Sequence, residues 1–237
     1  SMEATGVQGE YIRDGLDYDL WMSNIHRVLK EGNIDKLYMM MTINSLCLNS
    51  ITEFMDEMLD LRETYGTRAP IISLNILRFP SFQSAAILPE EIKSHYKEKI
   101  DKWIKSERPQ AMLDEGEKES VIRLIDYLDI VKTPHKNTAE TPKLYNDFKA
   151  FFAQYDIRRN KDFASTFPGP LGDWFTSLEA EVPSESDIRS KTISLVSLDR
   201  AGDPANTEAY GSGDDDHESV GGWDTEKDAL GGVNVDE

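Results

Sequence analysis

The stretch KLYMMMTI at Lys36–Ile43 is a continuous apolar run with the length of a β-strand, and a second such run, PIISLNIL, follows at Pro70–Leu77. Runs of this kind are typical of parallel strands that are buried on both faces. Between them, Ile51–Tyr65 carries apolar residues at helical spacing and is closed by Gly66. Another helical pattern, Leu16–Glu31, precedes the first run. This alternation of helix and strand predicts βα units and a parallel sheet.

The pattern changes after the second apolar run. It predicts helices over 89–105, 117–129 and 141–156, then an aromatic-rich segment that packs irregularly with one short helix over 158–178. Beyond residue 180 aliphatic residues become rare, apart from one possible lone strand at Thr192–Leu198, and residues from Arg200 on have the composition of a disordered tail. We therefore expect an α/β chain in three parts: a strand-containing region (1–88), a helical extension (89–180) and a largely disordered acidic tail (181–237).

The charge and composition exclude several classes of protein. The formal net charge is −18, and residues 200–237 contribute half of it, with eleven acidic against two basic residues. Such a charge disfavours nonspecific binding to nucleic acid or to anionic membranes. The sequence has no apolar run of membrane-spanning length and no signal-peptide pattern. A single cysteine fits a reducing compartment, so we expect a cytoplasmic location.

Ser1, Glu3 and Arg13 form the first candidate site, in the segment SMEATGVQGEYIRDG. An arginine offers a bidentate fork and a serine offers a donor, so the two together suit a ligand carboxylate. The alternative interpretation is that these side chains lie on a solvated N-terminal arm.

Polar residues at the ends of the two apolar runs form the second candidate site. Asn44 follows the first run, and Asn75 and Arg78 lie in or just after the second. Parallel α/β sheets bind ligands at the carboxyl ends of their strands, where these residues would lie. The alternative is that Asn44 simply caps the turn into the next helix.

Cys47 is the only cysteine of the chain, and it lies between two leucines. No histidine stands at a spacing typical of a zinc site. We therefore interpret Cys47 as a buried small apolar residue. The sequence also has no phosphate-binding loop and no HExxH or GxSxG motif.

The stretch SMEATGVQGEYIRDGLDYDLWMSNIHRVLKEGN resembles the middle of radical S-adenosylmethionine (SAM) enzymes, especially those of phages and marine bacteria with a C-terminal SPASM or twitch extension. That family shows Ser-x-Asp/Glu-Gly/Ala at a strand end, then Tyr-x-x-Ile/Arg-x-Gly, then a helix with an Asn. The residues that match are Ser1, Glu3, Ala4, Tyr11, Ile12, Arg13, Gly15 and Asn24. The resemblance covers residues 1–90 and is looser over 90–178. It implies a partial (β/α) barrel in which the two apolar runs are the fifth and sixth strands.

The resemblance implies SAM and a 4Fe-4S cluster as cofactors, with Ser1 and Arg13 contacting SAM and Asn44 lining the same cavity. The chain departs from the family in lacking the CxxxCxxC motif and the cysteines of an auxiliary cluster. One thiol cannot hold a four-iron cluster. Two hypotheses follow. In the first, this is the C-terminal part of a radical SAM-like enzyme, inactive alone, and the missing half comes from a separate polypeptide or is absent. In the second, it is a non-catalytic binding or structural protein that reuses the half-barrel and self-associates.

Overall fold

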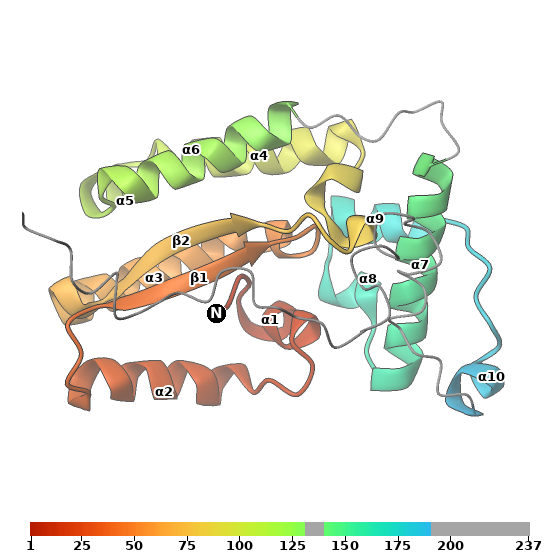
Figure 1. Ribbon diagram of the computed structural model, residues 1–237, viewed down its shortest axis with the longest axis horizontal. Helices are drawn as coiled ribbons and strands as arrows, with labels where there is room; N and C mark the ends of the chain where they lie inside the picture. Colours follow the sequence, from red (N-terminus) through yellow and green to blue (C-terminus); the bar gives the residue numbers. More distant parts are fainter. Residues whose placement is uncertain (131–139, 191–237) are drawn as a thin grey trace, which may run out of the picture. The chain divides into compact units, whose positions relative to one another are not determined.

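Two parallel strands, β1 (Leu37–Ile43) and β2 (Pro70–Ile76), form a two-stranded sheet in register from Leu37 opposite Pro70 to Ile43 opposite Ile76. The computed structural model describes residues 1–130 and 140–190. The expected lone strand at Thr192–Leu198 and the tail from Arg200 on lie outside these residues. Helix α3 (Ile51–Tyr65) connects the strands and packs against β2 (Figure 1). Both expected strands and the connecting helix are confirmed.

The remaining helices surround this unit. They are α1 (Gly6–Ile12), α2 (Tyr18–Glu31), α4 (Glu90–Ile104), α5 (Glu107–Met112), α6 (Glu115–Ile130), α7 (Glu140–Arg159), α8 (Phe163–Thr166), α9 (Pro170–Ser177) and α10 (Glu185–Ser190). The described chain is thus mostly helical with one small parallel sheet. Helix α10 falls in the range 181–190 that was expected to be part of the tail, and its Ile188 is buried.

The prediction that the strands are buried on both faces is wrong for β1. Met39, Met41 and Ile43 are buried, whereas Tyr38 and Met40 between them are 59% and 53% exposed. Successive side chains of a strand point to opposite faces, so β1 buries one face of the sheet and leaves the other open. The buried face packs with the fully buried Phe54 of α3 in one hydrophobic core. An apolar run alone cannot reveal this difference, because Tyr and Met continue the run on the open face.

The N-terminal residues lie against the edge of β1. The backbone N–H of Met2 donates to the carbonyl of Met40 at 3.1 Å, and Met2 and Ala4 are buried. The carbonyl of Ile43 accepts from the N–H of Leu77, just past β2. Because alternate carbonyls of a strand point to opposite sides, the Met40 carbonyl faces away from β2. The order across the sheet is therefore the N-terminal segment, β1 and β2.

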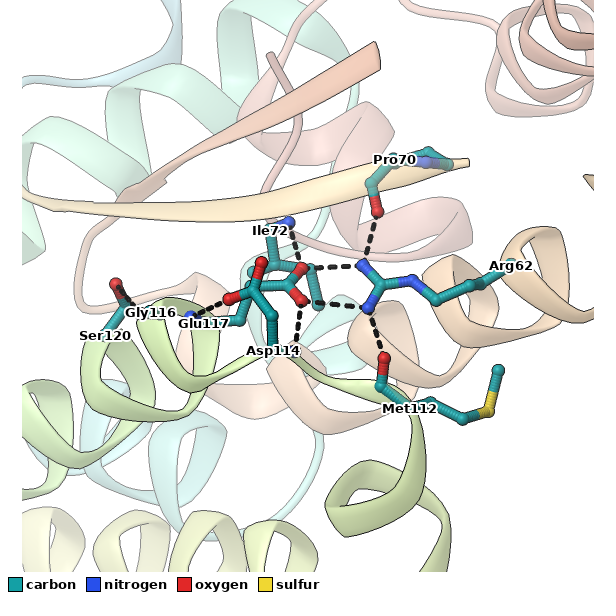
Figure 2. Close-up of polar contacts among 8 residues, drawn as sticks. All are labelled: Arg62, Pro70, Ile72, Met112, Asp114, Gly116, Glu117 and Ser120. Atoms are coloured by element: carbon teal, nitrogen blue, oxygen red, sulfur yellow. Dashed lines mark hydrogen bonds and ion pairs between the residues drawn. The ribbon is translucent and has the colours of Figure 1, made fainter. Parts of the chain in front are cut away.

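The other edge of the sheet is covered by a buried ion pair from α3 and α6. Figure 2 shows Glu117 of α6 between Arg62 of α3 and the backbone of β2. One carboxylate oxygen accepts from Arg62 Nη2 at 2.6 Å and from the Ile72 N–H at 2.8 Å, and the other accepts from Arg62 Nη1 at 2.8 Å. Arg62 also donates to the Pro70 carbonyl at 2.8 Å. Side chains thus take the place that a further strand would occupy beside β2 at these positions.

Candidate functional site

Ser1, Glu3 and Arg13 come together in the structure. Arg13 Nη2 lies 2.6 Å from Glu3 Oε2 and 3.4 Å from Ser1 Oγ. The Glu3 side chain is only 4% exposed, and that of Arg13 is 34% exposed. The buried segment 2–4 beside β1 fixes one partner, and the end of α1 presents the other, since Arg13 is the residue that follows this helix. The interpretation of a solvated arm therefore does not hold for Glu3 and Arg13, whereas Ser1 is exposed.

The Arg13 guanidinium keeps donor capacity beyond its ion pair. Its Nε is buried and has no hydrogen-bond partner among the described residues. Leaving a buried donor unpaired costs about 1–3 kcal/mol. The neighbouring Asp14 does not compete for Arg13, because its two carboxylate oxygens lie 3.1 Å from Arg159 Nη1 and from Lys161 Nζ. The Arg13 guanidinium is paired with a carboxylate and is partly open to solvent. It can therefore donate to a second oxyanion.

Asn44 closes the turn that follows β1, which was the alternative interpretation of this residue. Its Oδ1 accepts from the backbone N–H of Leu46 at 2.9 Å and of Cys47 at 3.0 Å, and its Nδ2 donates to the Thr42 carbonyl at 3.1 Å. All three polar bonds hold the turn from β1 into the short 3₁₀ helix Cys47–Asn49. Asn44 is 7% exposed and still lines a cavity.

Cys47 is buried in that turn, as expected. Its Sγ donates to the Asn44 carbonyl at 3.3 Å. Burial raises the pKa of the thiol far above its ordinary value, and the nearby Glu3 raises it further, although the hydrogen bond to the Asn44 backbone opposes the shift. Such a thiol is neither a reactive nucleophile nor a ready metal ligand. The backbone N–H of Thr5 donates to Ser50 Oγ at 3.3 Å, so the N-terminal segment lies close to the turn after β1.

A cavity of about 100 Å³ borders Asn44 and the residues directly before Arg13. It is lined by Tyr11 and Ile12, directly before Arg13, by Asn44 and Gln83, and by aromatic residues of α7 that include Phe151 and Tyr155. The Tyr155 hydroxyl donates to the Tyr11 carbonyl at 2.7 Å. Burial raises the pKa of Tyr155 to about 12, and nearby Asp14 adds to this rise. The cavity wall is therefore aromatic, neutral and held by hydrogen bonds.

Tyr11 and Asp156 form a second buried polar pair that the sequence did not single out. The Tyr11 hydroxyl donates to Asp156 Oδ1 at 2.7 Å, and the Phe163 N–H donates to Oδ2 at 2.9 Å. Burial raises the pKa of Tyr11 far above its ordinary value, and the bond to Asp156 raises it further. Burial also raises the pKa of Asp156. No sequence spacing signals this pair, because its partners are 145 residues apart.

Asn75 does not join the other predicted site residues. It is exposed on β2 and lines a different hollow, together with Arg78 and Arg123 of α6. Asn75 stands opposite Thr42 in the strand register, so both asparagines lie near the carboxyl ends of the strands, as expected. They nevertheless line separate hollows.

Over residues 1–130 and 140–190 the structure shows no group of three or more His, Cys, Asp or Glu side chains that could hold a metal ion. Within the same residues no helix is both long and apolar enough to cross a bilayer. Comparison with models of known protein families, with curated proteins and with solved structures finds no significant match. The resemblance to radical SAM enzymes therefore stays a prediction, and the proposals below stand on the geometry and on that resemblance.

Proposed function

We propose that this chain is the C-terminal part of a radical SAM-like protein and that Ser1, Glu3 and Arg13 help to hold S-adenosylmethionine. The observation that carries the proposal is the convergence of these three side chains beside β1. Sequence resemblance had assigned Ser1 and Arg13 to one ligand and Glu3 to the same motif, and nothing in their spacing alone required the three to meet. The two parallel strands and the N-terminal segment beside β1 support the proposal of a partial barrel.

The donors and acceptors of the cluster suit the methionine end of SAM. The Arg13 side chain is 34% exposed, and its contacts with Glu3 and Ser1 use only Nη2, which leaves Nη1 to donate to the ligand carboxylate. The Glu3 carboxylate next to it can attract the ligand ammonium group. The aromatic cavity beside Ile12 and Asn44 offers an apolar surface next to these charges. The residues of this chain would thus bind and orient SAM and exclude water from it.

Cys47 does not fit the iron–sulfur cluster that such enzymes use. It is fully buried, its sulfur bonds to the Asn44 backbone, and it is the only cysteine of the chain. When bound, the cluster supplies the electron that cleaves SAM in this family. In our proposal the cysteines that hold it lie outside the residues of this sequence.

SAM binding to the full chain, measured by equilibrium dialysis, tests this proposal. We expect saturable binding that Arg13→Gln weakens at least tenfold, because a charge-assisted hydrogen bond contributes about 1.5–3 kcal/mol. Arg27→Gln is the matched control: Arg27 is exposed on α2, and the charge change is the same. Equal affinities of wild type and Arg13→Gln, or equal losses in both variants, would contradict the assignment of Arg13.

The open face of the sheet favours the second candidate function, a non-catalytic protein that self-associates. Tyr38 and Met40 are more than half exposed there, and exposed apolar surface of this kind is found at interfaces. Sedimentation equilibrium of the wild type and of Met40→Lys tests it. Self-association predicts a dimer that dissociates in the variant, whereas a wild-type monomer up to 100 µM or so contradicts it.

A further inference from the structure

Arg78, two residues beyond the end of β2, lines two hollows. One, of about 330 Å³, is lined by Asn75 of β2 and by Ser120 and Arg123 of α6. The other, of about 320 Å³, is lined by Ser81, Ser84 and Tyr127. Arg78 belongs to both, so we call the two together the Arg78 cleft. Each hollow is within the size range of small-molecule sites, which is about 300–1,000 Å³.

The charge of the Arg78 cleft is opposite to that of the chain. The described residues that line it include two arginines and no aspartate or glutamate, although the net charge of the chain is −18. Arg78 is exposed and forms no ion pair with any described residue. In a protein with this excess of carboxylates, two guanidinium groups without an acidic residue in the lining indicate a site for an anion from outside.

Hydroxyl groups hold the second arginine and complete the donor set. Arg123 Nη2 donates to Ser120 Oγ at 2.8 Å, and Ser120 Oγ donates to the Gly116 carbonyl at 2.9 Å (Figure 2 shows this second bond). Ser84 Oγ and the Tyr127 hydroxyl lie 3.3 Å apart and share one hydrogen bond, so one of the two hydroxyl protons remains available to a ligand. Guanidinium forks combined with hydroxyls suit a tetrahedral oxyanion that has several acceptor oxygens.

Apolar residues line the cleft next to these donors. Leu74, Ile76 and Leu124 border the hollow that contains Arg123, and Ile87 and Leu144 border the other. A ligand in the hollow that both arginines line would therefore have its charged group near them and an apolar part beside Leu74, Ile76 and Leu124. We propose that the Arg78 cleft binds the phosphate group of a phosphorylated small molecule, a function independent of SAM binding at Arg13.

Isothermal titration calorimetry with phenyl phosphate tests this proposal on the full chain. We expect saturable binding that Arg78→Gln and Arg123→Gln each weaken at least tenfold and that Arg27→Gln leaves unchanged. We also expect weaker binding at higher salt, since both arginines are solvent-exposed. Inorganic phosphate should bind more weakly than phenyl phosphate, because it cannot contact the apolar lining.

Three outcomes would overturn the proposal. One is phenyl phosphate binding that neither Arg78→Gln nor Arg123→Gln reduces. Another is benzoate binding as tightly as phenyl phosphate, since the cleft would then recognise a carboxylate. The third is a chain that cosediments with vesicles containing phosphatidic acid but has no affinity for phenyl phosphate. The ligand would then be a membrane surface. Circular dichroism spectra of both variants matching the wild type would exclude misfolding as the cause of a loss.

Discussion

Replacing Glu117 by glutamine should lower the free energy of unfolding more than the same replacement of an exposed glutamate does. Glu117 is 2% exposed, and its carboxylate accepts four hydrogen bonds. Two come from Arg62, and the others come from the N–H groups of Ile72 and Asp114, the last at 3.0 Å. A glutamine offers one oxygen in place of two and turns an N–H₂ group toward donors. Arg62, whose side chain is 16% exposed, would lose its charge partner and one of its two hydrogen bonds to residue 117.

The magnitude follows from the buried charge that remains. Breaking a buried ion pair by removing one partner costs about 3–5 kcal/mol. For a chain of this size that lowers the melting temperature by roughly 6–20 °C, at about 2–4 °C per kcal/mol. Urea unfolding followed by circular dichroism measures the free energy of unfolding. The matched control is Glu119→Gln on the same helix, an exposed carboxylate that should change stability by less than about 0.5 kcal/mol.

Removing both partners separates the ion pair from simple packing. If the cost of Glu117→Gln comes from an unpaired Arg62, then Arg62→Met should cost less in a Glu117→Leu background than in the wild type. The reasoning is refuted if Glu117→Gln loses less than about 1 kcal/mol and so resembles the Glu119→Gln control.

Three further predictions concern the turn after β1 and the surface of α3. Cys47 should react with a thiol reagent in the native chain only as fast as the chain unfolds, because burial raises its pKa and closes access; rapid native labelling would contradict this. Asn44→Ala should cost about 1–3 kcal/mol in urea unfolding, since two backbone donors lose their acceptor, and Asn44→Asp should cost less. Burial alone would raise the pKa of Glu53, but the bond from Lys99 at 2.8 Å, the charge of Lys99 and the hydrogen bonds from the Glu53 backbone and Thr52 together lower it below its usual value. The stability that this half-exposed pair contributes is present above the usual glutamate pKa and is lost as the pH falls through the pKa of the folded state. Because Lys99 lowers the Glu53 pKa, Lys99→Met should raise it in a carbon-13 NMR titration. An unchanged Glu53 pKa would refute this prediction.

The periodicity of the sequence predicted the two strands and the helix between them, because local residue patterns determine these elements. Ile51–Tyr65 has the predicted bounds in the structure, because its apolar spacing and Gly66 both act locally. The β1 and β2 runs were placed to within a residue at each end. The open face of β1 was missed, since burial on a sheet depends on what packs over it and not on the strand itself.

The candidate site was predictable only in part. Ser1, Glu3 and Arg13 were chosen by family resemblance, and the structure brings them together. The role of Asn44 in the turn was predictable as an alternative, because asparagine side chains often hydrogen-bond to the backbone of a turn. Arg62 and Glu117 are 55 residues apart, and their pairing depends on how α6 packs against β2, which no local pattern encodes. The spacing of Asp114 and Glu117 predicts only the start of a helix. In the structure the Glu117 N–H donates to Asp114 Oδ1 at 2.8 Å at this start.

Mapping SAM on the full chain by nitrogen-15 NMR tests the central claim most directly. If Ser1, Glu3 and Arg13 hold the ligand, SAM should shift the amide signals of residues 1–15 and 44–47, and these shifts should disappear in Arg13→Gln. Shifts confined to the surroundings of Arg78 and Arg123, or no shifts at millimolar SAM, would contradict the account.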